Sequence, residues 1–511
     1  MAARPRTRTP VNVNSLASSN SSSNDRADAD ARTSARATTR PRPARAAAAL
    51  AAAVAGVLAA TVSAAPAAPA APATNRLDGT WQTDGYGMVI TIEDGQLTVY
   101  DRTRADCLPD QLSAAQLAAP GRNGTTRYGS GGVPLLTVTP QGRQHAIARS
   151  DGSVGHIRLD RLAALPALCA APPPTTPLTV FDDFWASFAE NYPFFTAKGI
   201  DWQALRDRYR PLIGPGTTDA QLGQIMTDML APLHDAHTAL AYQGGTVYSG
   251  LRSGTRSQTP QLRAQAQAAV DAQLVGPEQT WAQGKVGVGE LPGRIGYLRI
   301  WSFDDYVDGG GYQQQAAVLD QALDALLSTA NTTGPDALRG LVIDVRLNAG
   351  GSDALGLRVA SRLTDQAYTA YRKRARNDPD DATRFTRPEP ITVDPAATPR
   401  WTGPVALLTS SYTGSAGETF TQALMGRGPQ VTRIGDNTQG VFSDVLLRTL
   451  SADWLTALPN EEYLDARGHT FDGAGIPPDL RTPVFTAPEL AARQDSALSA
   501  ARRLLDPTGR H

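Results

Sequence analysis

This 511-residue sequence has few long apolar segments, only two cysteines and almost no net charge. After the first 64 residues, no segment approaches the roughly 20 apolar residues that a membrane-spanning helix needs, so no stable span is expected. The formal net charge of −1 gives no reason to expect nucleic acid or an anionic membrane surface as a partner. Apolar residues make up 41% and charged residues 19% of the chain, which is typical of soluble globular protein.

The two cysteines, Cys107 and Cys169, fall in the same early segment. Thiols confined to one small domain pair readily in an oxidising compartment, so we predict a disulfide between them. Two buried free thiols are the alternative interpretation.

The first 75 residues resemble a secretory leader followed by an Ala/Pro-rich spacer. Arginines at 40, 42 and 45 precede a short apolar run over 46–60, and small residues follow at 62–64. This order is that of a signal peptide, which predicts cleavage near Ala64 and a secreted or otherwise extracytoplasmic protein. A low-complexity Ala/Arg tail is the alternative.

The remaining chain divides by pattern into four parts. Residues 76–170 contain short alternating runs and hairpin turns, which predict a small all-β accessory domain, either sandwich or barrel. Residues 177–290 are expected to be mainly helical, with one aromatic stripe as core. Strands and helices then alternate over 291–485, which indicates an α/β core with mostly parallel strands. A C-terminal helix is predicted over 486–511.

Ser415 follows a buried-type strand and opens a predicted helix. A helix N-terminus offers free N–H groups and a positive dipole end, and the amide of Ala416 would point the same way, so a nucleophile there could have its oxyanion stabilised. The same spacing also fits a capping box, in which Ser415 caps the helix and Glu418 completes the box. Spacing alone does not separate the two interpretations.

Two further clusters carry residue types that catalysis uses. Gly350 and Gly351 follow a buried strand, where a glycine pair can turn the backbone sharply and present N–H groups to a substrate oxygen. His234 and His237 lie just beyond a predicted helix, and no lysine occurs after Lys373, so a histidine is the expected base for a serine nucleophile. Metal binding at the two histidines and a purely structural role are the alternatives.

Five segments, in order along the chain, resemble motifs of the S41 peptidases, the tail-specific and tricorn-core proteases. They are residues 233–238, 341–351, 411–418, 435–440 and 471–479. The resemblance implies a crotonase/ClpP-like α/β core that hydrolyses peptide bonds through an acyl-enzyme without a cofactor. The predicted β-domain lies outside it.

The resemblance also implies roles for single residues. Ser415 matches the nucleophile and His237 the base of the His-dependent branch, while Gly351, with Gly350 as its neighbour, and Ala416 match the backbone oxyanion donors.

The sequence departs from the family pattern at several positions. The segment at 438–440 lacks the lysine of the Ser–Lys branch, and Ala236 stands where the His branch can place a serine. Asp472 replaces the family's closing glutamate; we take it as the acid that orients His237, with Asp235 as second choice.

The leading hypothesis is therefore a secreted serine endopeptidase that acts on peptide or protein substrates. The alternative is a catalytically inactive protein that keeps the peptidase fold and binds peptide or lipid in its groove.

Overall fold

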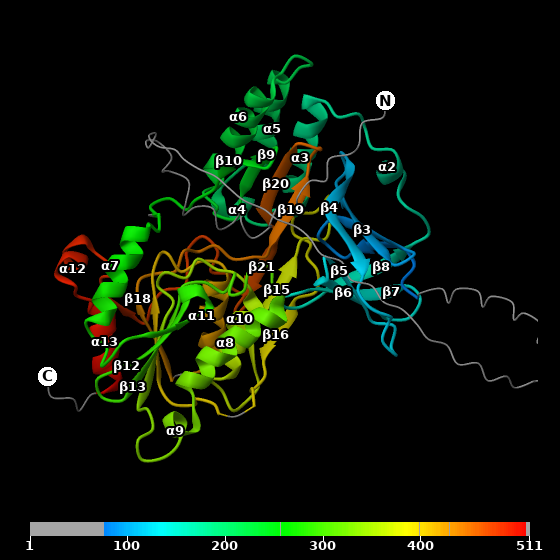
Figure 1. The fold of residues 1–511 in the computed structure, drawn as a ribbon. Helices are drawn as coiled ribbons and strands as arrows, with labels where there is room; N and C mark the ends of the chain where they lie inside the picture. Colours follow the sequence, from blue (N-terminus) through cyan, green and yellow to red (C-terminus); the bar gives the residue numbers. More distant parts are fainter. Residues whose placement is uncertain (1–75, 256, 398, 429, 507–511) are drawn as a thin grey trace, which may run out of the picture. The chain divides into compact units, whose positions relative to one another are not determined.

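The computed structural model describes residues 76–506, apart from positions 256, 398 and 429 (Figure 1). The predicted signal peptide and spacer lie outside the described residues. Among the helices of the described part, none combines the length and the apolar character that crossing a membrane requires.

The first domain is a closed eight-stranded antiparallel barrel, in which β1 pairs with both β2 and β8. Its strands are β1 (Gly79–Thr83), β2 (Met88–Glu93), β3 (Gln96–Arg102), β4 (Cys107–Gln116), β5 (Thr126–Ser130), β6 (Val133–Pro140), β7 (His145–Ser150) and β8 (Ile157–Leu162). Alternate side chains point inward, and large residues such as Trp81 and Tyr128 are fully buried there. The barrel interior is therefore a packed core.

A disulfide joins Cys107 to Cys169, with a Cα–Cα distance of 4.6 Å. Cys107 begins β4, and Cys169 lies in the short helix α2 (Ala167–Ala170) that follows the barrel. The bond ties the chain leaving the barrel back onto the barrel wall.

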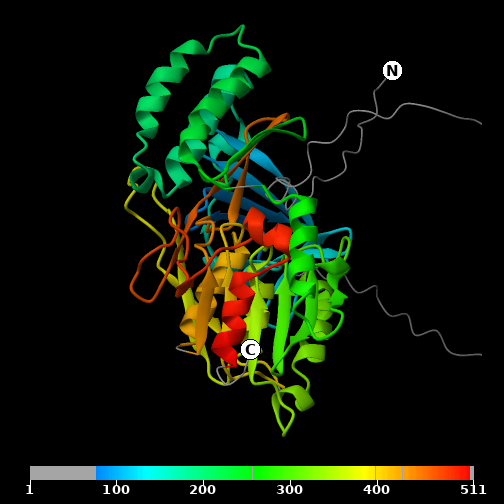
Figure 2. The same ribbon diagram turned by 90° about the vertical axis from the view of Figure 1, so that its left-hand side faces the viewer.

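Four helices follow, namely α3 (Pro177–Asn191), α4 (Phe195–Lys198), α5 (Trp202–Tyr209) and α6 (Asp219–Leu230). Helix α3 packs against both α5 and α6, and the helical region forms the upper left of Figure 2. Thr176 and Thr218 cap α3 and α6 through capping boxes. The aromatic stripe of α3 is core, with Phe181, Phe184 and Phe188 fully buried.

Asp183 of α3 is buried against the barrel and accepts a hydrogen bond from the Thr103 hydroxyl at 2.7 Å. Burial raises the pKa of Asp183 from its usual 3.8 to about 7. Since the folded state binds this proton more tightly than the unfolded chain, the contribution to stability is fully present below the unfolded pKa. It is lost as the pH rises from about 4 through 7.

We predict that Asp183→Asn removes this pH dependence. The free energy of unfolding of the variant relative to wild type should rise by on the order of 4 kcal/mol between pH 4 and pH 8. Urea unfolding at several pH values measures it. Asp182→Asn is the control, because Asp182 on the same helix pairs with Arg206 and Arg210 instead. A difference from wild type that stays constant with pH would contradict the prediction.

The region 177–290 contains strands as well as helices. The hairpin β9 (Ala239–Tyr242) and β10 (Gly245–Ser249) joins β20 (Trp454–Pro459) and β19 (Val445–Thr449) in one sheet of order β10-β9-β20-β19. The strands β9 and β10 are short, and β9 pairs with β20 more than 200 residues later in the chain. Local periodicity therefore could not predict this hairpin.

The main sheet has seven strands in the order β11-β12-β13-β14-β17-β18-β22. They are β11 (Gln279–Trp281), β12 (Val286–Leu291), β13 (Ile295–Ile300), β14 (Gly340–Asp344), β17 (Val405–Thr409), β18 (Val431–Gly435) and β22 (Leu480–Arg481). Pairing is parallel from β13 to β22, and β11 and β12 add an antiparallel edge. The sheet thus begins at 279, before the predicted boundary at 291.

Helices cover both faces of this sheet, which explains its unbroken apolar strands. Alternate residues of β14 and β17 pack on α8 (Tyr312–Leu326), α10 (Asp353–Ser361) and α11 (Ala416–Gly426). The opposite residues pack on α7 (Pro260–Asp271) and α13 (Ser496–Leu505). The C-terminal part holds two helices rather than one, since α12 (Ala487–Ala492) precedes α13.

A separate three-stranded sheet has the order β16-β15-β21. Its strands are β15 (Tyr368–Ala375), β16 (Glu389–Val393) and β21 (Glu461–Leu464). Figure 1 shows β15 and β16 lying next to the barrel, and a hydrogen bond from His156 of the barrel to Glu389 of β16 confirms the contact.

Candidate active site

Ser415 stands at the turn between the buried strand β17 and helix α11. Its backbone has φ 51° and ψ −123°, a conformation that favours glycine and costs a serine about 1–3 kcal/mol. The preceding loop is anchored, because the hydroxyls of Ser410 and Thr413 donate hydrogen bonds to the carbonyls of Arg346 and Val345 at 2.6 and 2.8 Å. The strained turn therefore holds Ser415 at the start of the helix, half-buried rather than sealed.

The capping-box interpretation of Ser415 and Glu418 does not describe this turn. Ser415 occupies the N-cap position, but its hydroxyl makes no capping hydrogen bond. The carboxylate of Glu418 instead accepts the N–H groups of Gly440 and Val441 at 2.6 and 2.7 Å. The Ser415 hydroxyl is thus left for another use.

Gly350 follows β14 and touches Ser415. A Cβ atom at Gly350 would lie 2.6 Å from the Cβ of Ser415 and 3.1 Å from its Oγ, and the φ of Gly350 is 123°. No other residue type fits so close an approach in this backbone conformation.

The two glycines differ in the use of their N–H groups. Gly350 donates its N–H to Oδ1 of Asn348 at 2.9 Å. Over the residues that the structure describes, the N–H groups of Gly351 and Ala416 have no acceptor. Unpaired amides beside a serine at a helix N-terminus are the donors that an oxyanion requires, so the geometry favours Gly351 over Gly350.

We predict that Gly350→Ala lowers kcat of a reaction in which Ser415 is the nucleophile by at least about 100-fold, because the new methyl group would displace Ser415. Gly309→Ala is the control for the backbone strain of an alanine at positive φ without a steric clash, since Gly309 has φ 64° and open space around it. Steady-state kinetics and thermal unfolding of both variants separate the two effects. Equal kinetics for the two variants would refute the steric argument.

His237 lies between the 3₁₀ turn η3 (Ala231–Leu233) and β9, and it is buried. Its backbone N–H donates to Asp235, and its ring Nδ1 lies 3.0 Å from the carbonyl oxygen of Phe442. A carbonyl can only accept, so Nδ1 carries the proton and Nε2 of the neutral ring is a free base. Burial lowers the pKa of His237, with Asp235, the Phe442 carbonyl and Asp444 acting in the opposite sense. His234 is exposed.

Neither predicted acid forms a hydrogen bond or ion pair with the ring of His237 in the described part of the chain. Asp235 accepts a hydrogen bond from Tyr192 at 2.8 Å and lies 3.6 Å from Lys198. Asp472 accepts the N–H of Phe442 at 3.2 Å. Burial, aided by the neighbouring charge of Asp235, raises the pKa of Asp472 well above its usual range. Asp472 thus reaches the histidine only indirectly, through the backbone of Phe442, whose N–H and carbonyl lie in adjacent peptide units.

Residues 440–442, which we call the strap, connect the serine to the histidine. The Val441 carbonyl accepts the N–H of Ser415 at 3.1 Å, and the next carbonyl, that of Phe442, accepts Nδ1 of His237. Two carboxylates, Glu418 and Asp472, hold the three N–H groups of the strap.

Because Ser415 and His237 are hydrogen-bonded to the carbonyls of two consecutive residues, the strap sets their relative position. Burial raises the pKa of Glu418 to about 7 against the opposing hydrogen bonds from the strap. Across the described residues no hydrogen bond joins the ring of His237 to the Ser415 hydroxyl, and such bonds commonly tighten only with substrate.

Sequence reasoning missed the strap. It treated residues 435–440 as a family motif that lacks the lysine, and it gave Glu418 no role beyond capping and membership of the motif at 411–418. An acidic residue three positions after the serine and a glycine at 440 were the available signals.

The described residues hold no group of three or more His, Cys, Asp or Glu side chains arranged to bind a metal ion.

Comparisons with known proteins add to this geometry. The profile of Peptidase family S41 matches residues 294–482, and that of the tricorn protease C1 domain matches residues 173–231. A search of curated proteins gave no match.

Several solved structures are similar. One, described as a "putative peptidase" from Parabacteroides merdae, is 26% identical, with a TM-score of 0.52, over 66% of this chain and 98% of that chain. Mature CPAF bound to lactacystin is 13% identical, with a TM-score of 0.47, over 65% and 98%. The photosystem II D1 C-terminal processing protease is 16% identical, with a TM-score of 0.39, over 61% and 94%.

Proposed function

The chain belongs to peptidase family S41 and is a serine-type peptidase, and from that premise we propose that Ser415 is its nucleophile and His237 its general base. The observation that carries the proposal is the strap: the N–H of Ser415 is bonded to the Val441 carbonyl, and Nδ1 of His237 is bonded to the Phe442 carbonyl. Nε2 of His237, left unprotonated by the Nδ1–carbonyl contact, is the atom that takes the Ser415 proton.

The reaction proceeds through an acyl-enzyme. Ser415 Oγ attacks the carbonyl carbon of the scissile peptide bond while Nε2 of His237 takes the hydroxyl proton. The N–H groups of Gly351 and Ala416 bind the oxyanion of the tetrahedral intermediate. His237 then returns the proton to the leaving amine, and a water molecule, deprotonated by His237, hydrolyses the ester.

Asp472 acts on His237 indirectly in this scheme. Its carboxylate holds the Phe442 N–H, and the carbonyl of the same residue holds Nδ1 and thereby fixes the ring and its tautomer. Asp235 supports the backbone of His237 instead.

Three finer features belong to the same proposal. The parallel strands β13 to β18, covered by helices on both faces, support a crotonase/ClpP-like core. The Cys107–Cys169 disulfide, with the predicted signal peptide, supports export to an oxidising compartment. Endopeptidase action on peptide or protein substrates is the expected activity.

The test is hydrolysis of an unfolded protein substrate such as reduced casein, followed by mass spectrometry of the products. We expect internal cleavage that a fluorophosphonate abolishes and a chelator leaves unchanged. Binding of the substrate without cleavage would instead support the non-catalytic binding protein.

A further inference from the structure

The barrel lies outside both matched ranges, yet the loop between β7 and β8 reaches the catalytic core. We call residues 151–153 the brace loop. The carbonyl of Gly152 accepts a hydrogen bond from the hydroxyl of Ser352, the N-cap of α10. Ser352 directly follows Gly351, whose amide is assigned to the oxyanion. The brace loop therefore holds the residue next to an oxyanion donor.

The same loop holds the chain beyond the strap. The hydroxyl of Ser153 donates to Oδ2 of Asp444 at 2.9 Å, and Nζ of Lys373 lies 3.1 Å from the same oxygen. Asp444 stands two residues after Phe442, whose carbonyl orients His237. Its negative charge also favours the protonated form of His237.

A buried charge cluster fixes this end of the contact. Lys373 lies 3.0 Å from Oε1 of Glu461, and Tyr86 of the barrel donates a hydrogen bond to the same carboxylate. Ser443, between Phe442 and Asp444, accepts the N–H of Glu461 at 3.0 Å. The segment after the strap is thus bonded to β21 and, through Ser153, to the barrel, while β21 is itself bonded to the barrel through Tyr86.

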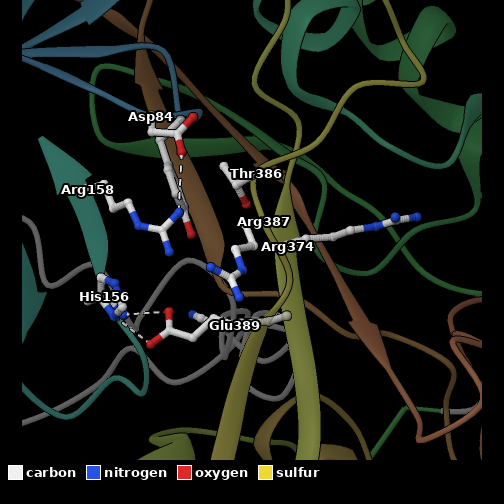
Figure 3. A pocket seen from close by; sticks show the side chains of 9 residues that line it. Asp84, His156, Arg158, Arg374, Thr386, Arg387 and Glu389 are labelled. Atoms are coloured by element: carbon white, nitrogen blue, oxygen red, sulfur yellow. Dashed lines mark hydrogen bonds and ion pairs between the residues drawn. The ribbon is translucent and has the colours of Figure 1, made fainter. Parts of the chain in front are cut away.

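A polar pocket opens beside this cluster, between the barrel and strands β15 and β16 (Figure 3). Figure 3 shows His156 of the barrel facing Glu389, with Nδ1 2.5 Å from the carboxylate. Lys373 and Tyr86 line the same pocket. This contact, together with the hydrogen bond from the His156 N–H to Glu389, keeps the end of β8 adjacent to the brace loop close to the core.

We propose that the brace loop is a positioning element of the active site, with Ser153 its principal residue. The inference rests on the proposed function. The oxyanion donor Gly351 and the histidine-orienting Phe442 belong to separate segments of the core. The brace loop bonds to the chain beside each, so it fixes the distance between oxyanion site and base. Through this loop alone, the barrel then helps to position the active site.

The test compares Ser153→Ala with Ser130→Ala, a barrel serine that is exposed and makes no side-chain hydrogen bond to the described core. We expect Ser153→Ala to lower kcat by on the order of tenfold, the effect of one hydrogen bond to a charged group, with KM within about twofold. Ser153→Thr, which keeps the hydroxyl, should restore most of kcat. Ser130→Ala should match wild type.

A double-mutant cycle with Asp444→Asn separates positioning from general loosening of the fold. If Ser153 acts through Asp444, Ser153→Ala should cost little more in the Asp444→Asn background. Equal kcat for Ser153→Ala and Ser130→Ala overturns the inference while leaving the peptidase intact. Should Ser153→Ala fail to fold, a folded Asp444→Asn protein with wild-type kcat overturns it as well. A wild-type protein that neither hydrolyses peptides nor reacts with a fluorophosphonate sinks the proposed function itself.

Discussion

Ser415→Ala should reduce peptide hydrolysis by on the order of 10⁶-fold, to the residual rate that the oxyanion site and substrate binding alone provide. The substitution removes only the hydroxyl oxygen. Ser415 N–H still donates to Val441, and the Glu418 and Asp472 contacts to the strap are unchanged. We therefore expect the variant to fold and to bind substrate with little change in affinity. Progress curves at high enzyme concentration measure the residual rate.

Ser411→Ala is the matched control, since it makes the same chemical change four residues earlier in the same loop. It should keep wild-type kcat. A Ser415→Ala protein that retains more than about one-hundredth of the wild-type rate would rule out Ser415 as nucleophile.

His237→Ala should lower kcat by about 10⁴-fold or more, because the Ser415 hydroxyl is a poor nucleophile without a base. His234→Ala provides the control, since His234 is exposed in the same segment and should be dispensable. Steady-state kinetics on both variants measure the contrast. Comparable losses in the two variants would mean that the segment, not the His237 imidazole, matters.

The pH dependence of the rate provides a second test of His237 as the general base. Catalysis needs its neutral form, and burial lowers its pKa below the usual 6.5. The rate should therefore fall on the acidic side only as the pH drops through that lowered pKa, so activity persists below pH 6.5. His237→Ala should lose this acidic limb. An acidic limb that is unchanged in His237→Ala would assign it to another group.

How far the sequence predicted the site depends on the distance over which each interaction acts. The strand at 405–409 and the serine at the following helix were predictable, because strand pattern and helix start are local signals. The glycine pair after β14 was predictable for the same reason, since only glycine suits that turn.

The strap was not predictable in this way. Its hydrogen bonds join residues that are 22, 30 and 205 positions apart, from Glu418, Asp472 and His237 respectively. A Glu three residues after a helix-opening Ser satisfies the capping rule locally, and only the tertiary fold redirects its carboxylate. The acid expected to orient His237 makes no direct bond to its ring for a related reason: the backbone of Phe442, which residue types do not reveal, stands between Asp472 and His237.

The β9–β10 hairpin and the brace loop also depend on the tertiary fold. Strand β9 is four residues long and completes its sheet with β20, while the brace loop is three polar residues in an ordinary barrel turn. Neither has a periodicity of its own, so each acquires its role only through distant partners.

The most direct measurement is to map the adduct of a fluorophosphonate by peptide mass spectrometry on the wild-type protein, with Ser415→Ala, His237→Ala and Ser411→Ala treated in parallel. We predict a single adduct on Ser415 in wild type and Ser411→Ala, none in Ser415→Ala, and labelling slowed by orders of magnitude in His237→Ala. An adduct on a different serine, or labelling that persists in Ser415→Ala, would contradict the account.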